Sequence, residues 1–194
     1  MMDLWTLPTR VTLGDTEYSL HTDYRDILEI FFYLEDPDLP VPVRWRIAMA
    51  LFYGEPVPRQ HWQAALDFMT AFLTCGRQEQ PGPRLMDWNH DAAAILAGVN
   101  RVAGQEIRAL PYVHWWSFLS WFHAMEPGQL STLVSIRQRL RQGKPLESWQ
   151  QEFYRANIRA VELPQRLSQQ EQQQRTALLA RLDAPCVKGA EHGT

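Results

Sequence analysis

The residues best suited to chemistry stand in the stretch MDWNHD, near the middle of the chain. Asp87, His90 and Asp91 follow the spacing i, i+3 and i+4, so they share one face if the stretch is helical. Carboxylate and imidazole groups placed in this way can bind a metal ion, and His114 or His123 could complete the ligand set. A metal-dependent enzyme that uses these residues is therefore one hypothesis.

A capping role accounts for the same stretch without a metal. Asp87 or Asn89 can accept hydrogen bonds from the free N–H groups at a helix start, and Asp91 meets the positive end of the helix dipole there. The sequence contains no HExxH or paired-cysteine pattern, no glycine-rich phosphate loop after a strand and no G-x-S-x-G elbow. We therefore favour the capping role and expect no catalytic residue, no metal site and no cofactor.

The aromatic stretch LPYVHWWSFLSWFHAM, residues 110–125, is the second candidate for a function. As a helix it is apolar nearly all round, which is typical of a helix in the middle of a core. An exposed aromatic surface that docks a partner is the alternative, because tryptophan is favoured at interfaces. The stretch is too short and too polar to cross a bilayer, which requires roughly 20 apolar residues.

Hydrophobic periodicity predicts the elements that position these groups. Apolar and polar residues alternate on both sides of Gly14 and Asp15, which predicts a short β-hairpin. Thr22 or Asp23 can then cap an amphipathic helix that ends at DPDLP, because proline cannot continue the helical ladder. We predict an all-α fold, a compact domain of about seven helices with a small N-terminal β-hairpin. The six further helices are expected at about 42–53, 58–75, 88–103, 110–125, 129–142 and 145–161.

Composition along the chain predicts one globular domain followed by a tail. The polar segment 76–84, rich in Pro and Gly, is expected to be a loop between two helical halves of a single domain at 1–163. Residues 164–194 are rich in glutamine, which predicts an isolated polar helix or a partly disordered tail.

Charge and cysteine content narrow the functional classes. The net charge of −3 gives no strong field that would recruit nucleic acid or acidic lipid. Arg137, Arg139 and Arg141 alternate along their expected helix, so they spread around it, and we expect them in solvent. Cys75 and Cys186 cannot form a disulfide framework, which fits a reducing cytosol. We expect neither a nucleic-acid nor a membrane partner.

Several of these segments together resemble the Gp15 family of tailed-bacteriophage proteins. The N-terminal part of the resemblance is YSLHTDYRDIL (18–28), followed by LEDPDLP. The more specific part joins MDWNHDAAAI (86–95) to HWWSFLSWF (114–122) and IRQR (136–139). The tail departs from the lysine-rich segment of the family, so the resemblance implies nothing for it. The motif residues are Asp87, Trp88, Asp91, His114, Trp115, Trp116 and Phe118.

The resemblance implies a phage or prophage tail morphogenesis protein, because such genes lie just ahead of the tape-measure gene, where tail assembly chaperones are encoded. A chaperone of this kind is a non-catalytic protein of the host bacterial cytoplasm that binds the tape-measure or tail-tube protein and could also self-associate. A minor structural tail protein of the virion is the alternative. Amphipathic helices of a client could dock on aromatic helix faces or order the glutamine-rich tail. The candidate docking residues are Trp45, Trp62, Trp115 and Trp121.

Overall fold

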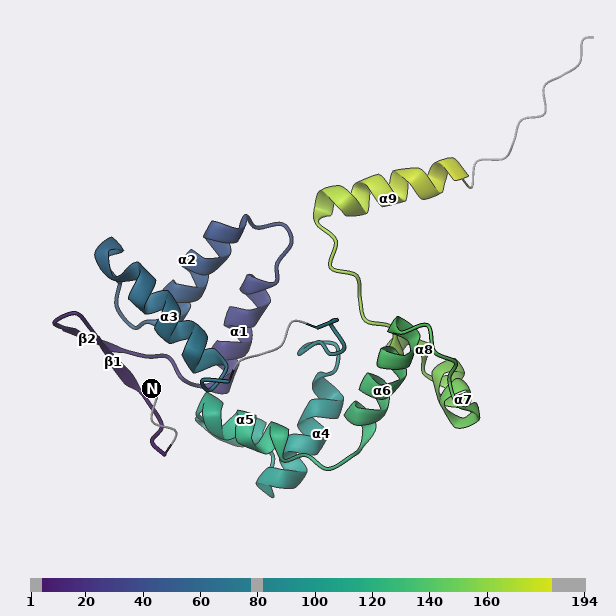
Figure 1. Ribbon diagram of the computed structural model, residues 1–194, viewed down its shortest axis with the longest axis horizontal. Coiled ribbons are helices and arrows are strands. Elements are labelled where there is room, and N and C mark those ends of the chain that lie inside the picture. The colour runs from purple at the N-terminus through teal and green to yellow at the C-terminus, as the bar shows by residue number, and fades with distance from the viewer. Residues whose placement is uncertain (1–4, 78–81, 183–194) are drawn as a thin grey trace, which may run out of the picture.

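The computed structural model describes residues 5–77 and 82–182, and this part of the chain is mostly helical (Figure 1). A two-stranded antiparallel hairpin, β1 (Arg10–Leu13) and β2 (Thr16–Ser19), comes first. The predicted all-α class with a small N-terminal hairpin is therefore confirmed. The helices are α1 (Tyr24–Leu34), α2 (Val41–Phe52), α3 (Trp62–Leu73), α4 (Ala92–Ala103), α5 (Trp115–His123), α6 (Gln129–Arg141), α7 (Ser148–Ala156), α8 (Ile158–Val161) and α9 (Gln169–Leu182), with 3-10 turns η1 (Arg59–His61) and η2 (Ile107–Ala109).

The hairpin packs one of its faces against the helices. Val11 pairs with Tyr18, and Gly14 occupies the turn with φ +61°, a conformation that a Cβ would strain. Leu13 and Tyr18 are buried, and the Tyr18 ring meets the edge of the Tyr53 ring at a centroid distance of 6.0 Å. Because an isolated hairpin is marginal in water, this packing at the end of α2 is what stabilises it.

Helices α1 and α5 start side by side, although 90 residues separate Asp23 from Val113. One oxygen of Asp23 caps α1 by accepting a hydrogen bond from the N–H of the second helical residue at 2.9 Å, and the other accepts from the N–H of Val113 at 3.0 Å. The N–H of Tyr24 donates to the Val113 carbonyl, and the N–H of Trp115 donates to the Thr22 carbonyl. Asp23, of the two candidate caps, thus fixes the starts of both helices.

Buried side chains form two hydrophobic clusters. The main cluster joins the hairpin to α1, α2, α3, α4 and α5, so it draws on chain from both sides of the predicted loop at 76–84, of which 78–81 lie outside the described residues. The second cluster is small and consists of Ala94, Leu133, Ile136 and Val161. Helix α4 contributes to both clusters and therefore links α6 and α8 to the main core (Figure 1).

Four helices differ from their predicted bounds by several residues. The helix predicted at 58–75 is α3, which begins at Trp62 because Arg59–His61 form the 3-10 turn η1. Helix α4 begins at Ala92 because the side chain of Asp87 holds the residues before it in a capping turn. Helix α5 begins at Trp115 because the preceding residues pair with the start of α1. The helix predicted at 145–161 is interrupted at Asn157, whose side-chain amide donates to the Phe153 carbonyl at 3.0 Å and competes with the helical ladder.

The C-terminal helix α9 stands apart from the other helices (Figure 1). Residues 162–168 connect α8 to α9, and we call this segment the strap. The predicted glutamine-rich helix corresponds to α9, whereas the remaining tail, 183–194, lies outside the described residues. None of the helices in the described chain is long and apolar enough to cross a bilayer.

Candidate functional site

A buried ion pair joins the MDWNHD stretch to α6. Asp91 is 2% exposed and Arg137 is 5% exposed. The two terminal nitrogens of Arg137 donate to the two carboxylate oxygens of Asp91, each at 2.7 Å. The other three N–H groups of Arg137 donate to the carbonyl oxygens of Leu85, Ala160 and Val161. All five guanidinium donors therefore have partners. Through Arg137, helix α6 holds both the start of α4, at Asp91, and the end of α8, at Ala160 and Val161.

Asp87, not Asn89, caps the turn that precedes α4. One carboxylate oxygen accepts from the N–H groups of Asn89 at 2.9 Å and His90 at 2.8 Å. The other accepts from Arg84 and, at 2.7 Å, from Arg166 of the strap. Burial acts to raise the pKa of Asp87, but the bonds from His90 and Arg84 outweigh it, so the pKa lies below its ordinary value. The carboxylate is ionised and holds the turn and the strap together.

The candidate metal ligands do not converge on one point. The oxygens of Asp87 and Asp91 bind arginines and backbone N–H groups, and the His90 ring lies 3.2 Å from the Ala160 carbonyl oxygen. His114 and His123 hydrogen-bond within their own segments or with the N-terminal segment. Within residues 5–77 and 82–182, no three His, Cys, Asp or Glu side chains are grouped so as to hold a metal ion. The geometry agrees with the capping role.

The first two tryptophans of α5 cap the last turn of α3. Trp115 is 1% exposed and Trp116 is 4% exposed. Their indole N–H groups donate to the carbonyl oxygens of Leu73 and Phe72, each at 2.9 Å. Carbonyl groups in the last turn of a helix lack partners within that helix, so each indole satisfies one of them while its ring fills the core.

Phe118 joins α5 to α1 by stacking. Its ring lies parallel to the Tyr24 ring at a centroid distance of 4.9 Å, and it stacks on the Trp115 ring at 5.5 Å. Trp88 completes the cluster, with its ring 5.2 Å from that of Phe122. The prediction that the aromatic stretch forms the centre of the core is therefore confirmed.

The four tryptophans predicted to dock a partner differ in exposure. Trp115 is buried by the core, so its assignment as a docking residue is wrong. Trp45, Trp62 and Trp121 are partly exposed, and the Trp62 indole N–H donates to the Val57 carbonyl at 2.9 Å. Partner binding by these three stays a prediction.

His114 caps α5 as a neutral imidazole. Its Nδ1 accepts a hydrogen bond from the Trp116 N–H at 3.0 Å, so the ring proton sits on Nε2, which faces the Pro8 carbonyl at 3.2 Å. Burial lowers the pKa of His114, and the hydrogen bond to Pro8 opposes this only in part. Protonating Nδ1 would remove the cap.

This arrangement predicts that the protein loses stability as the pH falls below about 6.5, the ordinary histidine pKa. In that range the unfolded chain binds the His114 proton more readily than the folded chain, so the stability present at higher pH is lost as the pH decreases. The lowered pKa values of Asp23 and Asp87 act in the same direction, but only as the pH falls below 3.8.

Urea unfolding midpoints measured between about pH 5 and about pH 8 test this prediction. We expect a His114→Asn variant to lose less stability over this range than the native protein, because its amide oxygen can cap the helix without titrating. An equal loss in the two proteins would show that His114 does not carry the effect.

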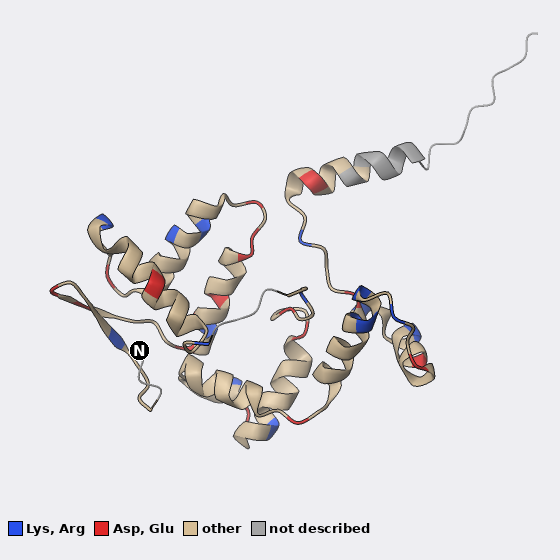
Figure 2. Ribbon diagram, in the orientation of Figure 1, with Lys and Arg blue, Asp and Glu red and all other residues tan. Residues whose placement is uncertain are grey.

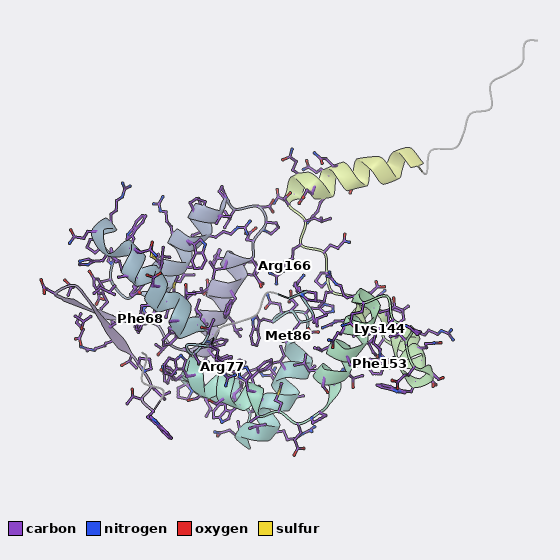
Figure 3. All side chains as sticks on the ribbon, in the orientation of Figure 1. Phe68, Arg77, Met86, Lys144, Phe153 and Arg166 are labelled. Atoms are coloured by element: carbon purple, nitrogen blue, oxygen red, sulfur yellow. The ribbon has the colours of Figure 1, made fainter. Side chains whose placement is uncertain are left out.

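An open groove of about 600 Å³ lies beside the Asp87 turn, and we call it the α1 groove. Its floor is apolar and comes from α1 and the turn, and its rim carries carboxylates. The strap crosses it with Pro164 and Arg166, and Figure 3 labels Arg166 on this segment. The floor residues are Leu28, Phe31, Phe32 and Trp88, and the rim carboxylates are Glu35, Asp36, Asp38 and Asp87.

Comparison of the chain with protein-family models, curated proteins and solved structures gives no match.

Two residues that organise this region were not predicted from the sequence. The expectation that Arg137 lies in solvent with Arg139 and Arg141 is wrong for Arg137, which is buried. The available signal was the position of Arg137 four residues after Leu133, on the apolar face of the helix. The second residue is Arg166, and no local pattern in the glutamine-rich segment indicates that this side chain reaches Glu35 and Asp87.

Proposed function

We propose that this chain is a non-catalytic tail morphogenesis protein of a phage or prophage, a tail assembly chaperone that binds the tape-measure protein, the tail-tube protein or both. The resemblance to the Gp15 family supports the connection to tails. The single observation that supports a binding role over a catalytic one is the use of the motif residues to hold the fold. Asp87, Asp91 and His114 are all buried and hydrogen-bonded to backbone or arginine groups.

The exposed surface is suited to such a role. A tape-measure protein is a long helical chain whose apolar stripes are open to water before the tail tube surrounds it. Amphipathic helices of this kind are bound by apolar grooves through side chains at i, i+3, i+4 and i+7. Weak contacts that repeat along one client add up by multivalency, so many copies of a small protein can cover it. The α1 groove and the partly exposed Trp45, Trp62 and Trp121 are candidate contact surfaces.

Co-expression of the full chain with the tape-measure protein of the same phage or prophage tests the proposal. We expect affinity capture of this chain to recover the tape-measure protein, and we expect more of that protein in the supernatant than when it is expressed alone. The tail-tube protein serves as a second bait in a parallel capture.

Mass spectrometry of purified virions separates the chaperone from the alternative. A chaperone is absent from finished particles, whereas a minor structural protein of the tail is present at a fixed copy number. Recovery of neither bait, together with presence in the virion, would replace the chaperone with that alternative. If neither bait is recovered and the protein is also absent from the virion, the connection to tails is contradicted.

A further inference from the structure

The carboxylates around the α1 groove outnumber the cations in it. Glu35, Asp36 and Asp38 lie at and after the end of α1, and Asp87 lies across from them. Figure 2 shows acidic residues at the end of α1 and in its following loop, and basic residues where α6 ends beside α8. Arg166 of the strap is the single arginine or lysine among the described residues that line the groove. Arg84 also pairs with Asp87 from outside the groove lining, so two cations face four carboxylates and an excess of negative charge remains.

The strap already places a basic side chain in this groove. The guanidinium of Arg166 forms ion pairs with both Glu35 and Asp87, so it bridges the two acidic sides. The start of α9, directly after the strap, adds one backbone bond, because the Gln169 N–H donates to the Asp38 carboxylate at 2.6 Å. Arg166 therefore shows which kind of group the acidic rim binds, namely an arginine from a separate chain segment.

The strap leaves the apolar floor of the groove largely uncovered. Pro164 is its only apolar side chain in the groove lining that the structure describes. Phe32 is 56% exposed, and Leu28, Phe31 and Trp88 are only partly buried. A ligand that brings an arginine or lysine together with an apolar stripe would satisfy the rim and the floor at once, which the strap does not.

We propose that the α1 groove binds an amphipathic helix whose apolar stripe is flanked by arginine or lysine, and that Arg166 competes with this helix by occupying the acidic rim. The strap is then an internal competitor, and the helix displaces it by adding contacts to Phe32 and its neighbours. The identity of the helix as a segment of a tail-protein client rests on the proposed function, whereas the charge and shape of the site do not.

Two synthetic helical peptides test the charge preference without knowledge of the client. Both are roughly 18 residues long, about five helical turns, and carry leucine at i, i+3, i+4 and i+7, but one has flanking arginines and the other flanking glutamates. We expect the full-length protein to bind the arginine peptide at least about tenfold more tightly in a calorimetric titration, and less tightly as salt is added.

Four variants, two of them controls, locate the binding and test the competition. Phe32→Ala should weaken the arginine peptide about tenfold, whereas Trp149→Ala should leave it within about twofold, since Trp149 is 52% exposed but does not line the groove. Arg166→Gln should strengthen it about three- to tenfold by removing the competitor. Arg159→Gln on α8 makes the same charge change away from the groove and should have a much smaller effect.

Hydrogen exchange on the native protein keeps the test decisive if Arg166→Gln does not fold. Peptide binding should slow exchange at the end of α1 and speed it in the strap. Equal affinities for the two peptides, protection elsewhere, or a strap that gains protection would overturn the proposal. Protection of the groove without peptide, seen only at high protein concentration, would also overturn it, because a second copy of the chain would then occupy the groove. If the peptide binds but no tail protein is recovered, the proposed binding of a basic amphipathic helix in the groove is supported. Only the tail function is then contradicted.

Discussion

Replacing Arg137 with alanine lowers the free energy of unfolding by about 3–5 kcal/mol, because it leaves the buried carboxylate of Asp91 without its counter-charge. The loss also strips hydrogen-bond donors from the carbonyl groups at Leu85, Ala160 and Val161. Urea unfolding followed by circular dichroism measures this change.

Arg139→Ala is the matched control on the same helix. Arg139 forms its ion pair with Glu147, and both side chains are at least one-third exposed to solvent. Such surface pairs contribute only about 0–1 kcal/mol, so this variant should unfold close to the native protein. Similar losses in the two variants would contradict the special position of Arg137.

A double variant separates the unpaired charge from the lost hydrogen bonds. The double variant Arg137→Met, Asp91→Asn should have a free energy of unfolding about 0.5–3 kcal/mol higher than Arg137→Met alone. Its urea midpoint should rise accordingly. The asparagine oxygen can keep the bond that Asp91 accepts from the Asp87 N–H at 2.9 Å. A double variant that is less stable than the single one would show that the buried charge is not the dominant cost.

Truncating Phe118 to alanine is expected to cost about 3–5 kcal/mol, the range for removing a fully buried phenylalanine. Phe118 is 1% exposed, and its ring stacks on both Tyr24 and Trp115, so its removal opens a cavity between α1 and α5. Thermal melts and urea titrations both report this loss.

Phe32→Ala provides the comparison for Phe118→Ala, because it removes the same atoms from a site that is 56% exposed. We expect it to cost less than about 1 kcal/mol, since little apolar surface is returned to water. A large cost at Phe32, or a small one at Phe118, would show that the aromatic core is not where stability resides. The same pair shows whether Phe32 can be changed to test peptide binding in a folded protein.

Local pattern was sufficient to predict the class of the fold and the place of most of its elements. The alternation around Gly14 predicted the hairpin, and the apolar excess of residues 110–125 predicted a core helix. Both predictions follow from the periodicity of apolar residues, which can be read from a short stretch of sequence. Helix boundaries were harder. Asp87 moves the start of α4 through local side-chain bonds that hydrophobic periodicity does not register, and residues 110–113 pair with the start of α1 through tertiary bonds that no short window contains.

The roles of the charged residues were the part that local pattern could not supply. Arg137, Arg139 and Arg141 look equivalent along the chain, yet only Arg137 faces Asp91, which is 46 residues away. Arg166 reaches Asp87 from 79 residues away. Spacing on a helix could place Asp87, His90 and Asp91 together, but whether their partners are metals or arginines depends on those long-range contacts.

The bond that Asp23 accepts from Val113 has a consequence for synthesis of the chain on the ribosome. At translation rates of about 5–20 residues per second, the 90 residues between them take roughly 5 to 20 seconds to appear. A helix of 11 residues such as α1 is only marginally stable by itself in water, so it is not stably formed before its packing partners are present. During that interval the start of α1 lacks the segment that pairs with it, and the core that joins α1 to α5 stays incomplete until α5 has been translated.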